Sequence, residues 1–441
     1  MTQSEIVKKI IHLEEKYNFF PESSAKINKW PFYRVYFFKK ICVELGITQD
    51  IKNSNNRKII NINTLLSLLK NINLHVFFHG ECEDLFFCSQ RIDTNNNEIY
   101  CSEFIKKSSS YKIISQTQNF KFIQGFYYLD FWKSVFTAIS VVWSRIFSLK
   151  EDEVFMNLCH DLGLDSHQQK KMVRHMRQYY FIYDLWHLFY KNVLKRIKPK
   201  KIYLVGGIFY APLVNVADAM NIDTIEIQHG VINKNHLGYH FPKTSRDGYF
   251  SRELYLLSNF WKEKASLPAG VKTTQTGNNY FYRQPTVSNK KNDVLFVSGP
   301  RYGDKVAEIA ISFAEKNKGV PISFKLHPRE AKDWKKRYKK LYELHQRQLI
   351  EIMTGISSSE KLQSFEYIIS TSSTMAYELI DMRKKVFIIN FHDDYFTEEV
   401  ELGYCKYFEN KHFCIDQMQK EDFNLPDFKF FSKFSFPNKD E

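Results

Sequence analysis

The sequence predicts an α/β protein with two domains, each built around a doubly wound parallel sheet. Three observations indicate this fold. Short runs rich in Val, Ile and Phe alternate with longer runs of helical spacing, which is typical of βαβ units. Polar segments rich in hydroxyl, imidazole or glycine groups follow several of these apolar runs. The chain has 441 residues, 44% of them hydrophobic, which is enough for two or three domain cores.

The first half is predicted to form one α/β domain with helical insertions, spanning residues 1–283. Its clearest part is a βαβ unit after Pro199, and such a unit is parallel and right-handed. The expected elements are a strand at 74–78, helical stretches across 131–198, a strand at 201–205, a helix at 212–220, a strand at 224–228 and a strand-like run at 271–276.

The second domain is predicted to span residues 284–415, because the stretch at 283–292 is polar and has no apolar periodicity. Regular alternation follows, with strands at 293–298, 321–326, 367–370 and 385–390 and helices at 304–316, 331–345 and 374–382. Two Rossmann-like domains of this kind, facing each other across a cleft, make the GT-B arrangement. Residues 416–441 are predicted to be a basic aromatic tail.

The composition excludes several classes of protein. The seven cysteines are odd in number and show no C-x-x-C spacing, which argues against a disulfide framework and a zinc site and indicates a cytoplasmic protein. Charged residues interrupt the first twenty residues, so no signal peptide is expected. No apolar run reaches the roughly 18 residues of a membrane-spanning helix. The formal net charge of +14 is dispersed, which suits solvated surface, acidic substrates or an anionic membrane.

Two segments are candidates for contact with the inner face of the cytoplasmic membrane. Residues 131–149 place apolar side chains at helical spacing, so a core helix is expected, with membrane contact as the alternative. The tail at 428–434 alternates Phe with Lys. It either lies on anionic lipid or folds back and buries its rings.

The segment Lys325 to Pro328 ends a predicted strand at the carboxyl edge of the sheet, where open α/β sheets bind ligands. Lys325 and His327 lie on the same face of the strand because side chains alternate. A histidine at this edge could donate a hydrogen bond or a proton to a phosphate, since the two groups titrate in the same range. The alternative is a His-Pro turn that caps a helix.

Five hydroxyl residues, 370–374, occupy the next strand-to-helix turn. Their hydroxyls and the amides of the helix start suit a phosphate, and they exceed what one N-cap requires. Glu378 lies one turn into the helix and either reaches a nucleotide ribose or faces the cleft. Gly299 and Arg301 follow the first strand of this domain, where glycine allows close backbone approach and arginine adds a cation; a simple turn is the alternative.

In the first domain, Gln228, His229 and Gly230 end a strand, and Tyr239 follows among further histidines. Such polar residues seldom sit buried without partners, so we expect them to face the cleft on the acceptor side. The histidines lack a nearby carboxylate pair or thiol, and no metal is predicted. Glu81 is the leading candidate for a catalytic carboxylate.

The Lys-x-His-Pro segment and the following Ser/Thr turn together resemble the His-Pro and Ser-Ser/Thr motifs of bacterial sialyltransferases and capsule Kdo transferases, which are GT-B enzymes using CMP-activated sugars. The likeness covers roughly residues 202–390. It implies that His327 contacts or protonates the CMP phosphate and that Ser372, Ser373 and Thr374 bind it. The Gln-His-Gly segment is similar to bacterial surface-polysaccharide transferases.

The sequence therefore predicts a glycosyltransferase that moves sialic acid or Kdo from a CMP donor onto a glycan or glycolipid of a bacterial capsule or lipopolysaccharide, without a cofactor. A CDP-polyol phosphotransferase and a UDP-sugar glycosyltransferase are alternatives on the same fold, because phosphate-binding groups do not read the base. A nucleic-acid-binding protein is the non-enzyme alternative. It is disfavoured, since only the tail interleaves cations with rings.

Overall fold

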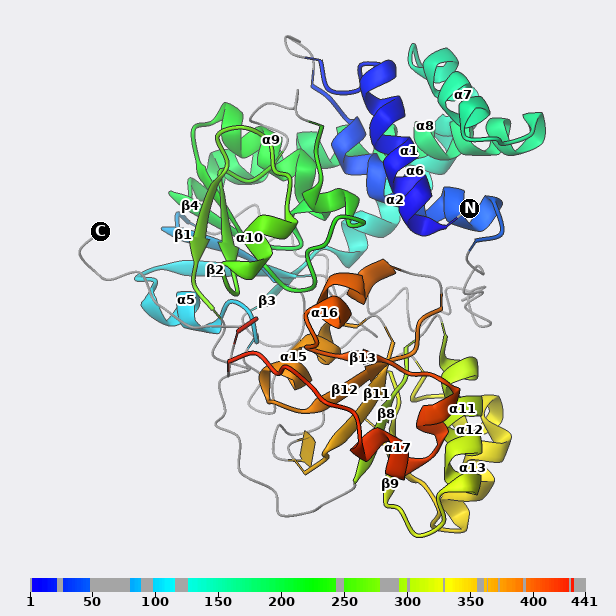
Figure 1. Ribbon diagram of the computed structural model, residues 1–441. Coiled ribbons are helices and arrows are strands. Elements are labelled where there is room, and N and C mark those ends of the chain that lie inside the picture. Colours follow the sequence, from blue (N-terminus) through cyan, green and yellow to red (C-terminus); the bar gives the residue numbers. More distant parts are fainter. Residues whose placement is uncertain are drawn as a thin grey trace.

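The computed structural model describes residues 2–21, 27–47, 80–88, 98–115, 126–242, 250–277, 293–299, 302–327, 330–354, 361–362, 364–371, 373–391, 394–427 and 430–431. Within these ranges the chain forms two α/β domains, one above the other in Figure 1. The predicted strand at 74–78 and the predicted boundary after residue 283 lie outside the described residues.

The N-terminal domain contains, in its described part, a seven-stranded parallel sheet with the order β3-β2-β1-β4-β5-β6-β7. The strands are β1 Asp84–Cys88, β2 Tyr111–Ser115, β3 Phe126–Tyr128, β4 Lys201–Val205, β5 Asp223–Ile227, β6 Glu253–Leu256 and β7 Lys272–Gln275. The helices are α1 Gln3–Lys16, α2 Trp30–Glu44, α5 Ser102–Lys107, α6 Asp130–Ile146, α7 Asp152–Asp161, α8 Ser166–Ile197, α9 Ala211–Ala219 and α10 Phe260–Lys264, with short 3-10 turns η1 Gly207–Tyr210 and η2 Leu237–Tyr239.

The C-terminal domain contains, where it is described, a six-stranded parallel sheet with the order β10-β9-β8-β11-β12-β13. The strands are β8 Val294–Val297, β9 Ile322–Lys325, β10 Glu351–Met353, β11 Tyr367–Ser370, β12 Lys385–Ile388 and β13 Lys406–Tyr407. The helices are α11 Gly303–Lys316, α12 Trp334–Arg337, α13 Lys339–Gln346, α15 Thr374–Asp381, α16 Thr397–Glu401 and α17 Ile415–Gln419, with 3-10 turns η4 Asp394–Phe396 and η5 Asn410–Phe413.

Both sheets have the doubly wound order in which the chain reverses direction after its third strand. The reversal falls between β1 and β4 in the first domain and between β8 and β11 in the second. Ligands of such sheets bind outside the carboxyl ends of the strands at this switch point. The predicted fold of two Rossmann-like domains in a GT-B arrangement is confirmed.

The sequence predicted the C-terminal domain more completely than the N-terminal one. Its strands β8, β9, β11 and β12 and the helix α15 begin and end close to the expected residues. In the first domain β4, α9 and β5 match the predicted βαβ unit, whereas β1, β2, β3 and β6 were not predicted. The helical stretch 131–198 consists of three helices, α6, α7 and α8.

The two domains share one hydrophobic cluster, which joins side chains of α1, α2, α7 and α8 to those of α15 and β12. At its edge the rings of Trp261 on α10 and Tyr377 on α15 lie 5.0 Å apart. Lys264 forms an ion pair across the same junction with Glu398 of α16. Burial of this contact fixes the domains relative to each other.

The described part of the predicted tail is packed into the protein. Met418 of α17 is fully buried in the core of the C-terminal domain. Phe431 is 2% exposed, and its ring centroid lies 5.0 Å from that of Tyr377 and 4.8 Å from that of Phe260. The fold-back alternative therefore holds for Phe431, and the membrane alternative is wrong for this ring. Phe430 is partly buried against the same cluster. Residues 428, 429 and 432–434 lie outside the described part.

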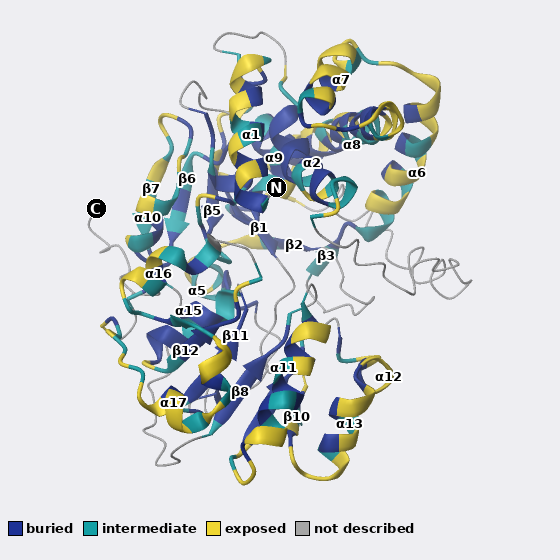
Figure 2. Cartoon of the chain, turned by 45° about the vertical axis from the view of Figure 1, so that its right-hand side comes forward, coloured by how far each residue is buried: buried dark blue, intermediate teal, exposed yellow. Residues whose placement is uncertain are grey.

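Figure 2 shows the strands of both sheets buried and the exposed residues concentrated on the outer helices. None of the helices in the described residues is both long enough and apolar enough to cross a membrane.

Candidate functional site

The carboxyl edges of the two sheets face each other. Gly230 lies just beyond β5 of the first domain, and Thr374 begins α15 just beyond β11 of the second. A Cβ atom placed on Gly230 would lie 3.7 Å from the Thr374 Oγ1 atom. The two motifs that the sequence singled out in separate domains therefore meet at one interdomain site.

On the C-terminal side, three adjacent strands of the order β9-β8-β11 contribute their ends to the site. Gly299 follows β8, and a Cβ atom at this position would lie 3.4 Å from the Thr371 Oγ1 atom that follows β11. This is the switch point of the sheet, so the predicted glycine and hydroxyl segments come together. Arg301, Pro328 and Ser372, which were also predicted to bind the donor, lie outside the described residues.

The start of α15 has the features of an anion site. Ser373 is its N-cap, with an extended backbone at φ −140° and ψ 152°, and its side chain makes no capping hydrogen bond. Instead the Ser373 Oγ atom lies 3.3 Å from Ser370 Oγ. The amides of a first helical turn have no acceptor within the helix, so they favour a negatively charged ligand.

Lys325 ends β9 on the face that α15 covers. The side chain is buried, 6% exposed, and burial lowers the pKa of its ammonium group, while the nearby Glu378 carboxylate opposes this shift. A buried cation here favours a negatively charged ligand.

His327 is held at the strand exit by Glu330, a residue that the sequence reading missed. The His327 amide donates to Glu330 Oε2 at 3.0 Å, and the Glu330 amide donates to the His327 carbonyl at 2.8 Å. The Tyr338 hydroxyl also donates to Glu330 Oε1, at 2.6 Å. Glu330 is 4% exposed, so its buried carboxylate holds the backbone of His327 in place.

An aromatic pair lies beyond the strands β8 and β12 of the same sheet. The rings of Tyr302 and Phe391 are stacked with centroids 4.4 Å apart and an interplanar angle of 30°. Both residues are partly exposed, and the Lys305 ammonium lies 5.3 Å from the Phe391 centroid. No motif marked this pair in the sequence.

On the N-terminal side, His229 is partly exposed and lies against the turn after β4. A Cβ atom at Gly206, whose φ is +79°, would lie 3.3 Å from His229 Cε1. The Tyr100 hydroxyl donates to the His229 carbonyl at 2.9 Å, which fixes the backbone of this segment. His229 thus lies directly before Gly230 after β5, and its role at the interdomain site stays a prediction.

Gln228 and Tyr239 require correction, because both side chains point into the domain. Gln228 is fully buried, its Nε2 atom donates to the Gly230 carbonyl at 2.9 Å, and its Oε1 atom accepts from the Leu257 amide at 2.9 Å. Tyr239 is 4% exposed and donates to Glu226 Oε1 at 2.7 Å. Their polar groups form hydrogen bonds inside the domain, so both residues support the Gln-His-Gly loop from the domain interior.

Glu226, within β5, was not singled out by the sequence. It is 1% exposed, and burial raises its pKa to about 7 against the opposing effects of the Tyr239 hydroxyl and the Gly207 amide. A Cβ atom at Gly207 would lie 2.4 Å from Glu226 Oε2, so glycine is required for this approach. An acidic residue inside an apolar strand was the available sequence signal.

Glu81 also requires correction. It precedes β1 and lies at the amino edge of the sheet, opposite the interdomain site, whereas the prediction assumed that it followed a strand. Its side chain is 65% exposed and forms a 2.6 Å ion pair with Lys198, which lowers its pKa. These are the properties of an ordinary surface acid.

Among the described residues, one group has donor atoms close enough for a shared metal ion. Cys88, Glu98 and Cys101 are buried, with these atoms within 4.8 Å of one another. The Tyr100 and Cys101 amides donate to Glu98 at 2.8 and 2.6 Å, and burial raises the pKa of both thiols. Hydrogen bonding within the core explains this group, and the absence of a metal stays a prediction.

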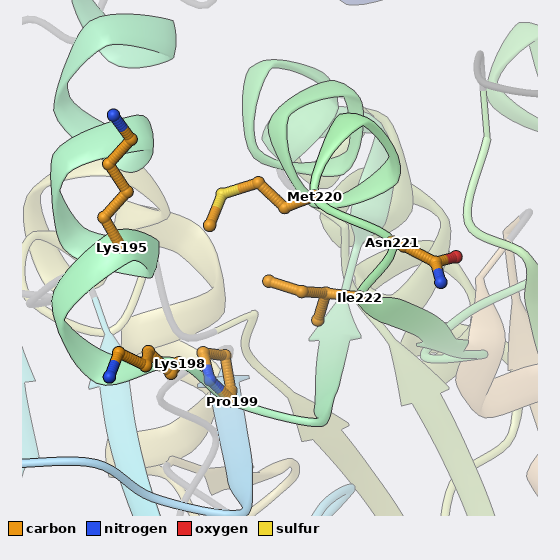
Figure 3. A pocket seen from close by; sticks show the side chains of 6 residues that line it. All are labelled: Lys195, Lys198, Pro199, Met220, Asn221 and Ile222. Atoms are coloured by element: carbon orange, nitrogen blue, oxygen red, sulfur yellow. The ribbon is translucent and has the colours of Figure 1, made fainter.

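A hollow of about 420 Å³ lies at the amino edge of the first sheet, away from the site. Figure 3 shows the side chains that line it. It is lined by Lys195, Lys198, Pro199, Met220, Asn221 and Ile222. These residues end α8 and α9 or precede β4 and β5, so the hollow is remote from the switch point.

Several solved structures are similar to this chain. The Methanocaldococcus jannaschii UDP-GlcNAc 2-epimerase in complex with UDP-GlcNAc and UDP is 14% identical, with a TM-score of 0.45, over 79% of this chain and 95% of that chain. S. aureus MnaA with UDP is 10% identical, with a TM-score of 0.44, over 80% and 91%. Acinetobacter baumannii MurG is 11% identical, with a TM-score of 0.42, over 77% and 89%. No protein-family model and no curated protein matches the chain.

Proposed function

We propose that this protein is a nucleotide-sugar-dependent glycosyltransferase whose donor phosphate binds at the start of α15. The observation that carries the proposal is the meeting of Gly230 with Thr374, because it joins the carboxyl edges of both sheets in one site. A transferase needs such an arrangement, with the donor on one domain and the acceptor on the other.

The donor side supplies groups that suit a phosphate diester. Ser373 and Thr374 offer hydroxyls at the first turn of a helix, and Lys325 adds a cation from the neighbouring strand end. Hydrogen bonds to a charged acceptor contribute about 1.5–3 kcal/mol each. Glu378, on α15, is the candidate contact for the nucleotide ribose.

In the proposed reaction, the bond between the anomeric carbon and the donor phosphate oxygen breaks while the acceptor oxygen bonds to that carbon. His327 donates a hydrogen bond or proton to the departing phosphate, for which its titration range is suited. His229, on the facing domain, is the candidate base that takes the proton of the acceptor hydroxyl. Glu330 positions His327 through the backbone bonds described above.

We favour CMP-activated sialic acid or Kdo as the donor and a bacterial capsule or lipopolysaccharide glycan as the acceptor, following the motif resemblance. A carboxylated sugar also suits a protein with a net charge of +14. UDP-sugar transfer and CDP-polyol transfer would use the same phosphate-binding groups. A UDP donor differs from a CMP donor in its base and in its number of phosphates, and a CDP donor differs only in its number of phosphates.

The test is calorimetric titration of CMP, CDP and UDP, followed by donor hydrolysis with the matching nucleotide sugars. Ser373→Ala combined with Thr374→Ala should weaken nucleotide binding by at least about a hundredfold, since two bonds to a charged group are lost. Ser134→Ala with Thr137→Ala on α6, whose hydroxyls bond only backbone carbonyls, is the matched control. Unchanged affinity in the α15 variant, or no nucleotide binding by the wild type, would contradict the proposal.

A further inference from the structure

The helix α6 is packed in an unusual way. Its buried residues Phe136, Ser140 and Ser144 form one stripe at a spacing of four, and this stripe faces α8. Two of the three are serines whose hydroxyls donate to backbone carbonyls of their own helix. A surface helix ordinarily buries its largest apolar side chains, and α6 buries mainly small ones.

Near the C-terminal end of α6 large apolar side chains point outward instead, whereas Trp132 and Phe136 in its first half pack against α8. Val142, Trp143, Ile146 and the adjoining Phe147 are 53%, 38%, 66% and 52% exposed. On α8, Phe181 extends this surface, with its ring centroid 5.6 Å from that of Trp143 and 6.3 Å from that of Phe147. Figure 2 shows α6 at the outer edge of the N-terminal domain, with exposed residues along its length. We call Val142, Trp143, Ile146, Phe147 and Phe181 the α6 face.

The charges beside the α6 face have one sign. Residues 131–150 contain Lys133, Arg145 and Lys150 and no acidic residue. All three cations are exposed. The acidic residues that flank this stretch are Asp130, at the opposite end of α6 from the α6 face, and Glu151 with those beyond it, where α7 begins. A helix with outward Trp and Phe rings flanked by Lys and Arg has the composition of segments that lie in the headgroup region of a bilayer.

From this surface we infer that the α6 face docks the protein onto an anionic lipid bilayer. The helix lies parallel to the membrane, with Ile146 and Phe147 entering the headgroup region and Arg145 and Lys150 contacting lipid phosphates. Each cation near an anionic surface adds a favourable contribution that salt screens. A second copy of the chain is a poorer occupant, because two surfaces of the same positive sign repel.

Vesicle sedimentation tests the inference. The full chain should sediment with phosphatidylethanolamine–phosphatidylglycerol vesicles and much less with phosphatidylcholine vesicles, and added salt should weaken binding. Ile146→Asn with Phe147→Ser should reduce binding about tenfold or more, because two apolar side chains no longer enter the bilayer. Leu349→Asn with Leu402→Asn is the matched control. These leucines are 45% and 43% exposed on the other domain and should leave binding unchanged.

A second measurement separates docking from damage to the fold. Tryptophan emission of the full chain should be quenched by brominated lipids, and Trp143→Phe, which keeps an aromatic ring, should lose most of that quenching while still sedimenting. Wild-type sedimentation of the Ile146→Asn/Phe147→Ser variant would overturn the inference. Wild-type quenching in Trp143→Phe would also overturn it. The same holds if the wild type does not bind vesicles and the Ile146→Asn/Phe147→Ser variant changes from dimer to monomer.

Discussion

Replacing Phe431 by alanine tests whether the last described residues hold the two domains together. The ring is 2% exposed and packs between Phe260 and Trp261 of the N-terminal domain and Tyr377 of the C-terminal domain. A Phe→Ala change in a core costs about 3–5 kcal/mol, through lost transfer energy and the cavity that remains. We therefore expect Phe431→Ala to lower the free energy of unfolding by this amount.

Truncation after residue 427 should cost more than the point substitution. The Trp261 Nε1 atom donates to the Phe431 carbonyl at 2.7 Å, and the Phe431 amide donates to Asp381 Oδ1 at 2.8 Å. Removing both partners leaves two buried groups unsatisfied, at about 1–3 kcal/mol each. The total of roughly 5–11 kcal/mol approaches the whole stability of a typical protein, about 5–15 kcal/mol. The truncated chain should be largely unfolded at 25 °C.

The assay is equilibrium unfolding in urea, followed by tryptophan emission, which reports Trp261 directly. Phe147→Ala is the matched control, because this ring is 52% exposed and its loss should change stability by no more than about 0.5 kcal/mol. If Phe431→Ala loses less than about 1 kcal/mol, or the truncated chain unfolds at the wild-type midpoint, the ring is not a structural link between the domains.

Three further predictions concern the site. His327→Ala should lower turnover about a hundredfold at saturating donor while leaving nucleotide affinity within a few-fold, as for a lost general acid, and steady-state kinetics would show this. The pKa of Glu226 is about 7 in the folded protein, against the usual 4.5 in the unfolded chain. As pH rises from about 4.5 to 7 the unfolded chain loses this proton first, so the contribution of Glu226 to the free energy of unfolding falls. Relative to wild type, Glu226→Gln should therefore gain stability between pH 5 and 7.5 in urea melts, and parallel pH profiles would contradict the assignment. Gly207→Ala should destabilise the protein by at least about 1–3 kcal/mol, because the new Cβ atom would lie 2.4 Å from Glu226 Oε2. A thermal midpoint equal to that of the wild type would show that the loop moves aside without cost.

The sequence predicted the C-terminal domain well because its strands are continuous apolar runs separated by helices of ordinary length. The strands β10 and β13 have three and two residues and offered no such run. In the first domain, β1 was missed because Asp84 opens it and a polar, glycine-containing stretch precedes it. Hydrophobic periodicity does not detect strands that are this short or that begin with a polar residue.

The sequence predicted the separate motifs of the candidate site. It could not tell which polar side chains in these motifs face outward. Gly230 lies at the interdomain site, whereas Gln228 and Tyr239 of the same stretch bond internal groups. A polar residue that follows a strand can either face the site or hydrogen-bond groups inside the domain. The direction that the chain takes after the strand decides between these two. Glu330 was overlooked because its role depends on partners in the following helices.

The link through Phe431 also bears on how the protein is made. Helices α1 and α2 belong to the same hydrophobic cluster as Phe431, yet Phe431 follows every strand of both described sheets in the chain. Domains commonly fold in order as they leave the ribosome. Here the surface of the N-terminal domain around Trp261 would stay uncovered until residue 431 is translated. During synthesis that surface therefore depends on a late segment of the chain, or on a chaperone, to cover it.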